Sequence, residues 1–214
     1  MNRLLRYSIV VGVVCVIALI VYVYTKNTCK IYQRIQTVDG LVEIVDNTCE
    51  EGLPHTTTAD VIRMTRDIWD SHRREEILRH ERIHLDQKRR PDVWQAFYRL
   101  SWDYDILPSA PVQLDSLHEL RPNPDTLGKP WAVWRKRYLF FPTYSGEHTL
   151  RDASVRVYDM ETKQFVEVPP EWRSMFCHEG KCPHQYEHPH EMAAEYVTHG
   201  SKAPAALKLF AWRK

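Results

Sequence analysis

The chain has 214 residues, of which 43% are hydrophobic and 27% charged, and its formal net charge is +1. This length fits one domain with a short additional segment. The first 26 residues carry three basic residues and no acid, so the remainder holds slightly more acidic than basic residues. A nucleic-acid-binding domain should show a basic surplus, and we therefore predict no nucleic-acid partner.

An uncharged, apolar segment occupies residues 7–25. As a helix it would span about 28 Å, close to the hydrocarbon thickness of a bilayer. A cleaved signal peptide is the alternative, but its apolar region should be shorter and end in small residues, whereas this one ends in two tyrosines. We therefore expect a tail over 1–6, a single transmembrane anchor over 7–25, a stem over 26–30 and one domain over 31–214. The lipid bilayer is then a partner, with the N-terminus cytoplasmic and the domain extracytoplasmic.

Four cysteines lie outside the apolar segment, namely Cys29, Cys49, Cys177 and Cys182. An even number in a translocated domain favours two disulfides. Pairing between sequence neighbours, Cys29–Cys49 and Cys177–Cys182, is one of three possibilities. The second pair lies in a cluster that also contains His178, His184, His188 and His190. These residue types also suit a structural zinc site, which remains the alternative to the second disulfide.

Helices and strands are predicted to be segregated along the domain. An Asp-Gly pair between two β-rich runs predicts a hairpin over 31–46, followed by a polar loop over 47–58. Helical patterns cover 59–71, 73–90, 92–103 and 190–199. Residues 107–130 are mostly loop, and strands are expected over 138–141, 155–158 and 164–168. The segregation predicts an α+β fold.

The helix predicted over 73–90 contains the sequence His80-Glu81-Arg82-Ile83-His84. Two histidines four residues apart lie on one helix face and can bind one Zn²⁺. Glu81 is suited to act as general base toward a water molecule rather than as a ligand. A charged surface helix is the alternative interpretation of this segment.

A catalytic zinc site needs a third protein ligand and an open fourth position. The extended motif that supplies a third histidine is missing, because Gln87 and Arg90 stand where it requires Gly and His. Glu191, on the helix predicted over 190–199, is the best candidate; His188, His190 and Glu195 are the substitutes. Glu195, one turn after Glu191, is expected to orient His80 or His84 through the free ring nitrogen.

His80-Glu81-x-x-His84 together with Glu191-x-x-Ala194-Glu195 resembles the gluzincin class of zinc metallopeptidases. The resemblance covers two short helices. It implies a zincin-like helical core, a Zn²⁺ cofactor held by His80, His84 and Glu191, and Glu81 as the base. A peptide or protein substrate would be hydrolysed.

Such a peptidase usually needs a donor that stabilises the oxyanion of the transition state. Tyr144, His148 and Tyr196 are the candidates, and their spacing selects none of them. The competing hypothesis is a non-catalytic, zinc-stabilised structural or interaction protein of a membrane, for example that of a virion or an organelle. The short chain favours this alternative because little of it remains to build a substrate cleft.

Overall fold

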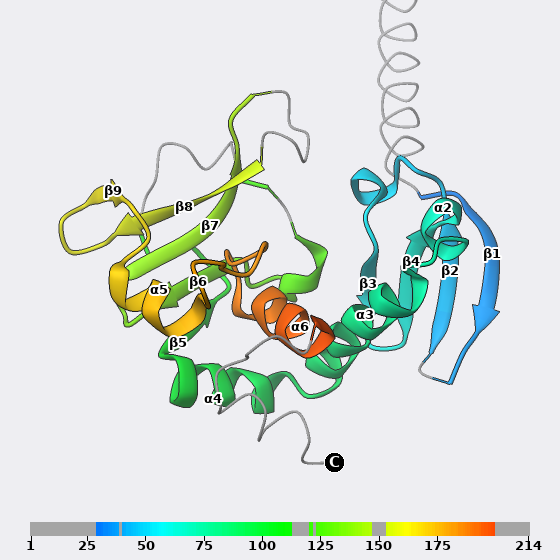
Figure 1. Cartoon of the computed structure of the whole chain (residues 1–214), viewed down its shortest axis with the longest axis horizontal. Coiled ribbons are helices and arrows are strands. Elements are labelled where there is room, and N and C mark those ends of the chain that lie inside the picture. Colours follow the sequence, from blue (N-terminus) through cyan, green and yellow to red (C-terminus); the bar gives the residue numbers. More distant parts are fainter. Residues whose placement is uncertain (1–28, 39, 113–119, 122, 147–152, 200–214) are drawn as a thin grey trace, which may run out of the picture.

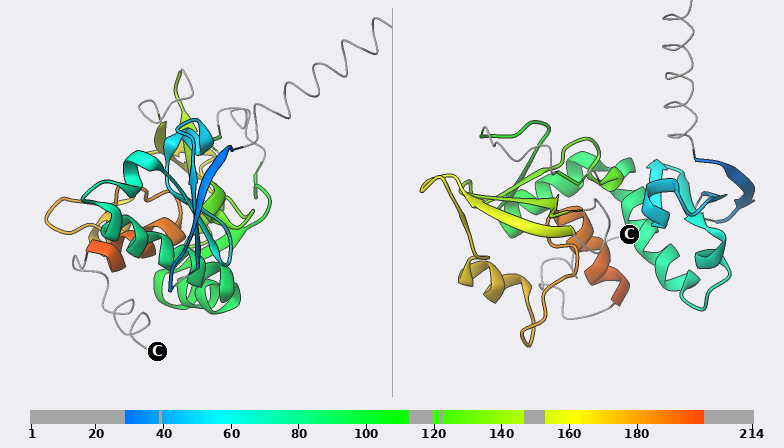
Figure 2. Two further views of the ribbon diagram at one scale, coloured as in Figure 1. Left: turned by 90° about the vertical axis from the view of Figure 1, so that its right-hand side faces the viewer. Right: turned by 90° about the horizontal axis from the view of Figure 1, so that it is seen from above.

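The computed structural model describes residues 29–38, 40–112, 120–121, 123–146 and 153–199 (Figure 1). Within these ranges the chain forms two β-sheets and five α-helices. In Figure 1 and in the right-hand view of Figure 2, the two sheets lie toward opposite ends of the described structure, and the helices of residues 74–89 and 189–199 lie between them. The candidate histidines therefore lie on an inner helix.

The first sheet, sheet A, follows the described N-terminal end. Its spatial order is β1 (Ile31–Gln36), β2 (Leu41–Val45), β4 (Val61–Thr65) and β3 (His55–Thr58). The pairs β1–β2 and β3–β4 are antiparallel, whereas β2 and β4 are parallel. Strand β3 is thus an edge strand, and it contacts helix α3.

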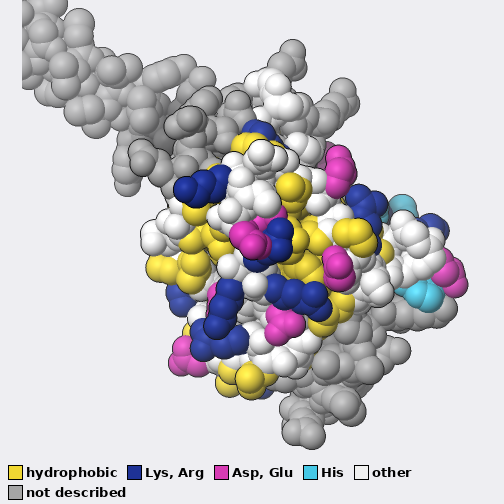
Figure 3. Space-filling model, turned by 90° about the vertical axis from the view of Figure 1, so that its left-hand side faces the viewer, with side chains coloured by type: hydrophobic (Ala, Val, Ile, Leu, Met, Phe, Trp, Pro, Cys, Tyr) yellow, Lys and Arg dark blue, Asp and Glu magenta, His cyan; other side chains and the backbone are white. Residues whose placement is uncertain are grey.

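The second sheet, sheet B, is an antiparallel meander. It consists of β5 (Tyr104–Leu107), β6 (Trp131–Trp134), β7 (Tyr138–Tyr144), β8 (Ala153–Asp159) and β9 (Gln164–Val166). The short edge strand β9 exposes Phe165 and Val166, and the Arg156 guanidinium lies 3.5 Å from the centre of the Phe165 ring. Figure 3 shows the face on this side of the molecule, where hydrophobic side chains lie among charges of both signs.

The helices connect and cover the sheets. They are α2 (Arg66–Trp69), α3 (Arg74–Arg89), α4 (Pro91–Trp102), α5 (Pro170–Phe176) and α6 (Pro189–His199), with short 3-10 helices η1 (Cys49–Gly52) and η3 (Pro124–Thr126). Helix α3 has Glu75 and Glu76 in its first turn and Lys88 and Arg89 in its last. These charges complement the helix dipole.

Helix α3 joins two hydrophobic cores. Leu78 and Leu85 on one side of it pack with the apolar residues of β2 and β4. Its partner α6 contributes Met192 and Ala193 to a larger aromatic core with α4, α5 and sheet B. Helices α3 and α6 pack against each other, so the helix that carries His80 and His84 lies beside the helix that carries Glu191.

The predicted fold class is wrong in two respects. The chain forms a mixed α/β arrangement with a parallel β2–β4 pair, not an α+β fold with a zincin-like helical core. None of the helices that the structure describes has the length and apolar character that a bilayer span requires. This finding contradicts the predicted location as a single-pass membrane protein with a cytoplasmic N-terminus and an extracytoplasmic domain. The anchor predicted over 7–25 lies outside the described residues.

The loop predicted over 47–58 is wrong, as is the helix predicted over 59–71, whose apolar spacing suits a strand as well as a helix. The segment forms β3, β4 and the four-residue helix α2 instead of a loop and a long helix. Apolar residues at 61, 62, 64 and 68 fit a helical face, but β-branched Thr56, Val61, Ile62 and Thr65 favour strands. Pairing with β2 decides the outcome.

Other predicted elements are present. The hairpin over 31–46 forms β1 and β2, and the helices predicted over 73–90, 92–103 and 190–199 correspond to α3, α4 and α6. Cys29 is bonded to Cys49, and Cys177 to Cys182, which confirms the pairing between sequence neighbours. The second disulfide removes both thiolates from the alternative structural zinc site.

Candidate functional site

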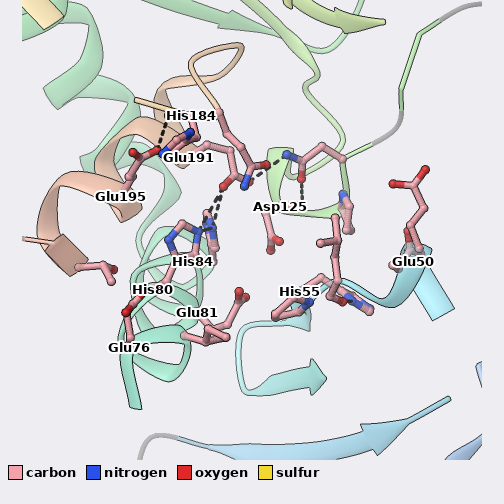
Figure 4. A pocket seen from close by; sticks show the side chains of 18 of the residues that line it. Glu50, His55, Glu76, His80, Glu81, His84, Asp125, His184, Glu191 and Glu195 are labelled. Carbon is pink, nitrogen blue, oxygen red and sulfur yellow. Dashed lines mark hydrogen bonds and ion pairs between the residues drawn. The ribbon is translucent and has the colours of Figure 1, made fainter. Parts of the chain in front are cut away.

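His80 and His84 point from α3 toward α6. Their Nε2 atoms are 3.0 Å apart, and the ring of His84 is 1% exposed. The one-turn spacing places both rings on the same helix face, as the sequence requires. The two nitrogens therefore converge on one point between the helices (Figure 4).

Glu191 reaches the same point from the first turn of α6. Its Oε2 atom lies 3.3 Å from His80 Nε2 and 3.4 Å from His84 Nε2. The other oxygen, Oε1, accepts a hydrogen bond of 2.9 Å from Asn123 Nδ2. Asn123 thus leaves one carboxylate oxygen directed at the two imidazoles.

The spacing of these three atoms suits a zinc ion. In tetrahedral coordination with bonds of about 2.05 Å, neighbouring ligand atoms are about 3.3 Å apart. The observed separations of 3.0, 3.3 and 3.4 Å match one face of such a tetrahedron. Two neutral nitrogens and one carboxylate oxygen are also donor types that zinc prefers. The residues therefore fit the ion.

A second possible ligand set comprises Glu81, His84 and Asp125. It shares His84 with the first set. His84 Nδ1 lies 2.7 Å from Gln87 Oε1, so only its Nε2 remains for a metal. The two sets are therefore alternatives, and the first is the better metal site, because Asp125 in the second already accepts hydrogen bonds from Thr56 and Lys88.

Glu81 lies beside the ligands but outside their triangle. Its side chain is 3% exposed, and its Oε2 atom has no hydrogen-bond partner among the described residues. Burial, reinforced by the neighbouring Asp125, raises the pKa of Glu81 well above its ordinary value. A buried carboxyl group with a free oxygen at a cavity can exchange a proton with a bound molecule.

The pKa values of His84 and Glu191 are shifted because the two side chains lie close together. Burial alone would lower the pKa of His84, but Asp125 and Glu191 outweigh it and raise the pKa to about 10. Burial likewise opposes ionisation of Glu191, yet the two histidines hold the pKa of Glu191 well below its ordinary value. The carboxylates therefore favour a positive charge at this point, either a proton or a metal ion.

The ligands open onto a cavity of about 260 Å³. Helix α3 forms its floor, and the residues around η1, the segment 123–125, Tyr144 and α6 form its walls. Carboxylates outnumber guanidinium groups in the lining, which contains Glu50, Glu51, Glu76, Glu81, Asp125, Glu191, Glu195, Arg73 and Arg121. His80, Glu81, His84 and Glu191 therefore line one cavity.

Asp125 is a cavity residue that the sequence did not indicate. Its Oδ1 atom accepts hydrogen bonds from the backbone and side chain of Thr56 and from Lys88 Nζ, the last at 3.1 Å. Lys88 also donates to the Thr56 carbonyl. This buried cluster ties α3 to the edge strand β3 and to η3.

Comparisons with protein-family models, with curated proteins and with solved structures find no significant match to this chain. The assignment of a function therefore depends on the site itself.

The structure does not bring Glu195 to the ligand histidines. Its Oε2 accepts a hydrogen bond of 2.7 Å from the backbone N–H of His184, at the cavity rim. The neighbour of His84 Nδ1 is instead Gln87, one turn further along α3. The spacing of His84 and Gln87 on one face was visible in the sequence, whereas the loop residues Asn123 and Asp125 gave no signal.

His188 and His190, the alternatives for the third ligand, donate hydrogen bonds to backbone carbonyls instead. His188 Nε2 donates to the Lys129 carbonyl, and His190 Nδ1 donates to the Asp125 carbonyl. Burial lowers the pKa of His190 to about 4. Both rings therefore support the loops around the cavity.

The three candidate oxyanion donors differ in where they lie. Tyr144 lines the cavity, and its hydroxyl bonds to Glu51. The Tyr196 hydroxyl donates to the Phe176 carbonyl within the aromatic core. His148 lies outside the described residues. Of the two that are described, only Tyr144 faces the cavity.

Proposed function

We propose that this chain is a zinc-dependent peptidase, in which His80, His84 and Glu191 hold the metal and Glu81 is the general base. The observation that carries the proposal is a triangle of donor atoms with edges of 3.0–3.4 Å, assembled from two separate helices beside a buried carboxyl group with a free oxygen. Ordinary surface helices do not bury such a cluster.

The roles of the side chains follow from their positions. A zinc ion held there would supply Lewis-acid chemistry, by lowering the pKa of a water molecule and polarising a carbonyl group. The positive charge of such an ion would favour the ionised form of Glu81, and that carboxylate accepts the proton that the attacking water loses and then delivers it to the nitrogen of the departing amine. Tyr144 lines the same cavity, and its hydroxyl would have to leave Glu51 to donate to the developing oxyanion.

A peptide bond is the substrate that uses all these groups. Its hydrolysis needs an activated water, a proton for a poor amine leaving group, and stabilisation of negative charge on oxygen. The alternative is a protein that holds zinc for stability alone. A structural site has four protein ligands, whereas the proposed set has three and lines a cavity.

The experiment compares full-length wild-type protein with Glu81→Gln. Zinc content is measured by mass spectrometry, and cleavage is measured with labelled casein and a peptide library. We expect about one zinc per chain in both proteins and at least a 100-fold lower cleavage rate in the variant, since general base catalysis contributes about 10²–10⁴-fold.

His80→Ala is the matched control, because it should lose both zinc and activity. Undiminished cleavage by Glu81→Gln would remove Glu81 as the base. Stoichiometric zinc without cleavage of any peptide by the wild type would support the structural alternative instead.

A further inference from the structure

We infer that Gln87 is a positioning residue, whose side-chain amide directs His84 Nε2 at the metal and locks the ligand-bearing helices α3 and α6 together. This inference rests on the proposed metal site. Gln87 is fully buried, and its amide lies within hydrogen-bond distance of groups on three helices.

The orientation of the amide follows from one of its neighbours. One end of the amide lies 3.0 Å from the carbonyl oxygen of His190, which can only accept a hydrogen bond. The NH₂ group must therefore face His190, and it also donates to the Tyr98 hydroxyl at 3.0 Å. The carbonyl oxygen Oε1 then faces His84 Nδ1 at 2.7 Å.

This orientation fixes the hydrogen on His84. Because Oε1 is an acceptor, Nδ1 must carry the hydrogen and donate it. The lone pair of neutral His84 is then on Nε2, the atom that lies 3.0 Å from His80 Nε2 and 3.4 Å from Glu191 Oε2. A hydrogen-bond partner on the far nitrogen is how proteins orient histidine ligands.

The same amide also acts on the third ligand. His190, whose carbonyl accepts from Gln87, directly precedes Glu191 on α6. Gln87 therefore joins His84 on α3 to the residue next to Glu191, while Tyr98 supports it from α4. Displacement of one helix along the other would break the contact to the His190 carbonyl.

Two variants separate the acceptor function from the general packing of Gln87. Gln87→Met keeps the length of the side chain but loses the acceptor for His84. Gln87→Glu keeps an acceptor for His84. Both variants lose the NH₂ group that donates to His190, and Gln87→Glu also places a carboxylate against the His190 carbonyl, so a merely structural role would weaken Gln87→Glu at least as much as Gln87→Met.

The measurements use the full-length, zinc-loaded protein. Zinc affinity is determined by competition with a chelator, and ¹⁵N NMR of the histidine rings identifies the protonated and the metal-bound nitrogen of His84. In the wild type we expect Nδ1 to carry hydrogen and Nε2 to be metal-bound. We expect about 10–100-fold weaker zinc binding by Gln87→Met, and a smaller loss in Gln87→Glu, which keeps the acceptor for His84 but not the donor to His190.

Equal affinities of the two variants would overturn the inference, as would a wild-type spectrum with zinc on His84 Nδ1. The wild-type spectrum decides the matter even if neither variant folds. Zinc binding without peptide cleavage would contradict the proposed catalytic function but not this inference. A wild-type protein that takes up no zinc would contradict the proposed metal site itself.

Discussion

At the scale of single residues, the two oxygens of Glu191 have different partners. Oε2 faces the histidines, and Oε1 is held by the amide of Asn123. Asn123 has a second task, because its own Oδ1 accepts the backbone N–H of Asp125 at the start of η3. Its contribution to zinc binding can therefore be separated from its contribution to the loop.

Replacement of Asn123 should weaken zinc binding. Asn123→Ala leaves Glu191 Oε1 without its donor, and we expect about tenfold lower zinc affinity in a chelator competition. Asn123→Asp keeps the acceptor for the Asp125 N–H but loses the donor to Glu191. It should lose at least as much affinity as Asn123→Ala; wild-type affinity in Asn123→Asp would show that only the loop contact matters.

At the scale of elements, the sequence predicted those whose limits are marked by local chemistry. Helix α3 has acids at its start, bases at its end and Pro91 after it, and an Asp-Gly pair marks the β1–β2 turn. Strands β3 and β4 carry no such limits. The apolar spacing of β4 fits either period, and β3 contains no apolar residue. Their strand state depends on the pairing of β4 with β2 and of β3 with β4, which local sequence does not reveal.

The ion pair between Arg137 and Asp159, at the end of β8 in sheet B, can be tested by substitution. The Arg137 guanidinium binds both carboxylate oxygens of Asp159, at 3.0 and 2.6 Å. This contact holds the pKa of Asp159 at about 2, below the ordinary 3.8. A depressed carboxyl pKa stabilises the folded state above pH 3.8, and the contribution disappears as pH falls toward 2.

Asp159→Asn should therefore lower the free energy of unfolding at neutral pH. The difference from wild type should shrink between about pH 4 and pH 2 in chemical denaturation curves. Arg137→Gln is the reciprocal control and should give the same pH dependence. A difference that stays constant over this range would show that Asp159 contributes through packing or its hydrogen bonds to the following turn, not through its charge.

At the scale of the whole molecule, the site is assembled from segments far apart in the sequence. The H-E-x-x-H pattern marked His80, Glu81 and His84 because their chemistry depends on spacing within one helix. The helix predicted over 190–199 indicated Glu191. Asn123 and Asp125 come from the connection between β5 and β6, where no periodicity constrains the path, so only the packed structure places them beside His84 and Glu191.

The most direct test of the proposed metal site is X-ray absorption spectroscopy on the zinc-loaded, full-length protein. We predict one zinc per chain, with two imidazole nitrogens and carboxylate or water oxygens at about 2.0–2.2 Å and no sulfur. In Glu191→Ala the two imidazoles should remain while zinc affinity falls. A chain that binds no zinc, or a spectrum with sulfur ligands or without imidazole, would contradict the proposed metal site.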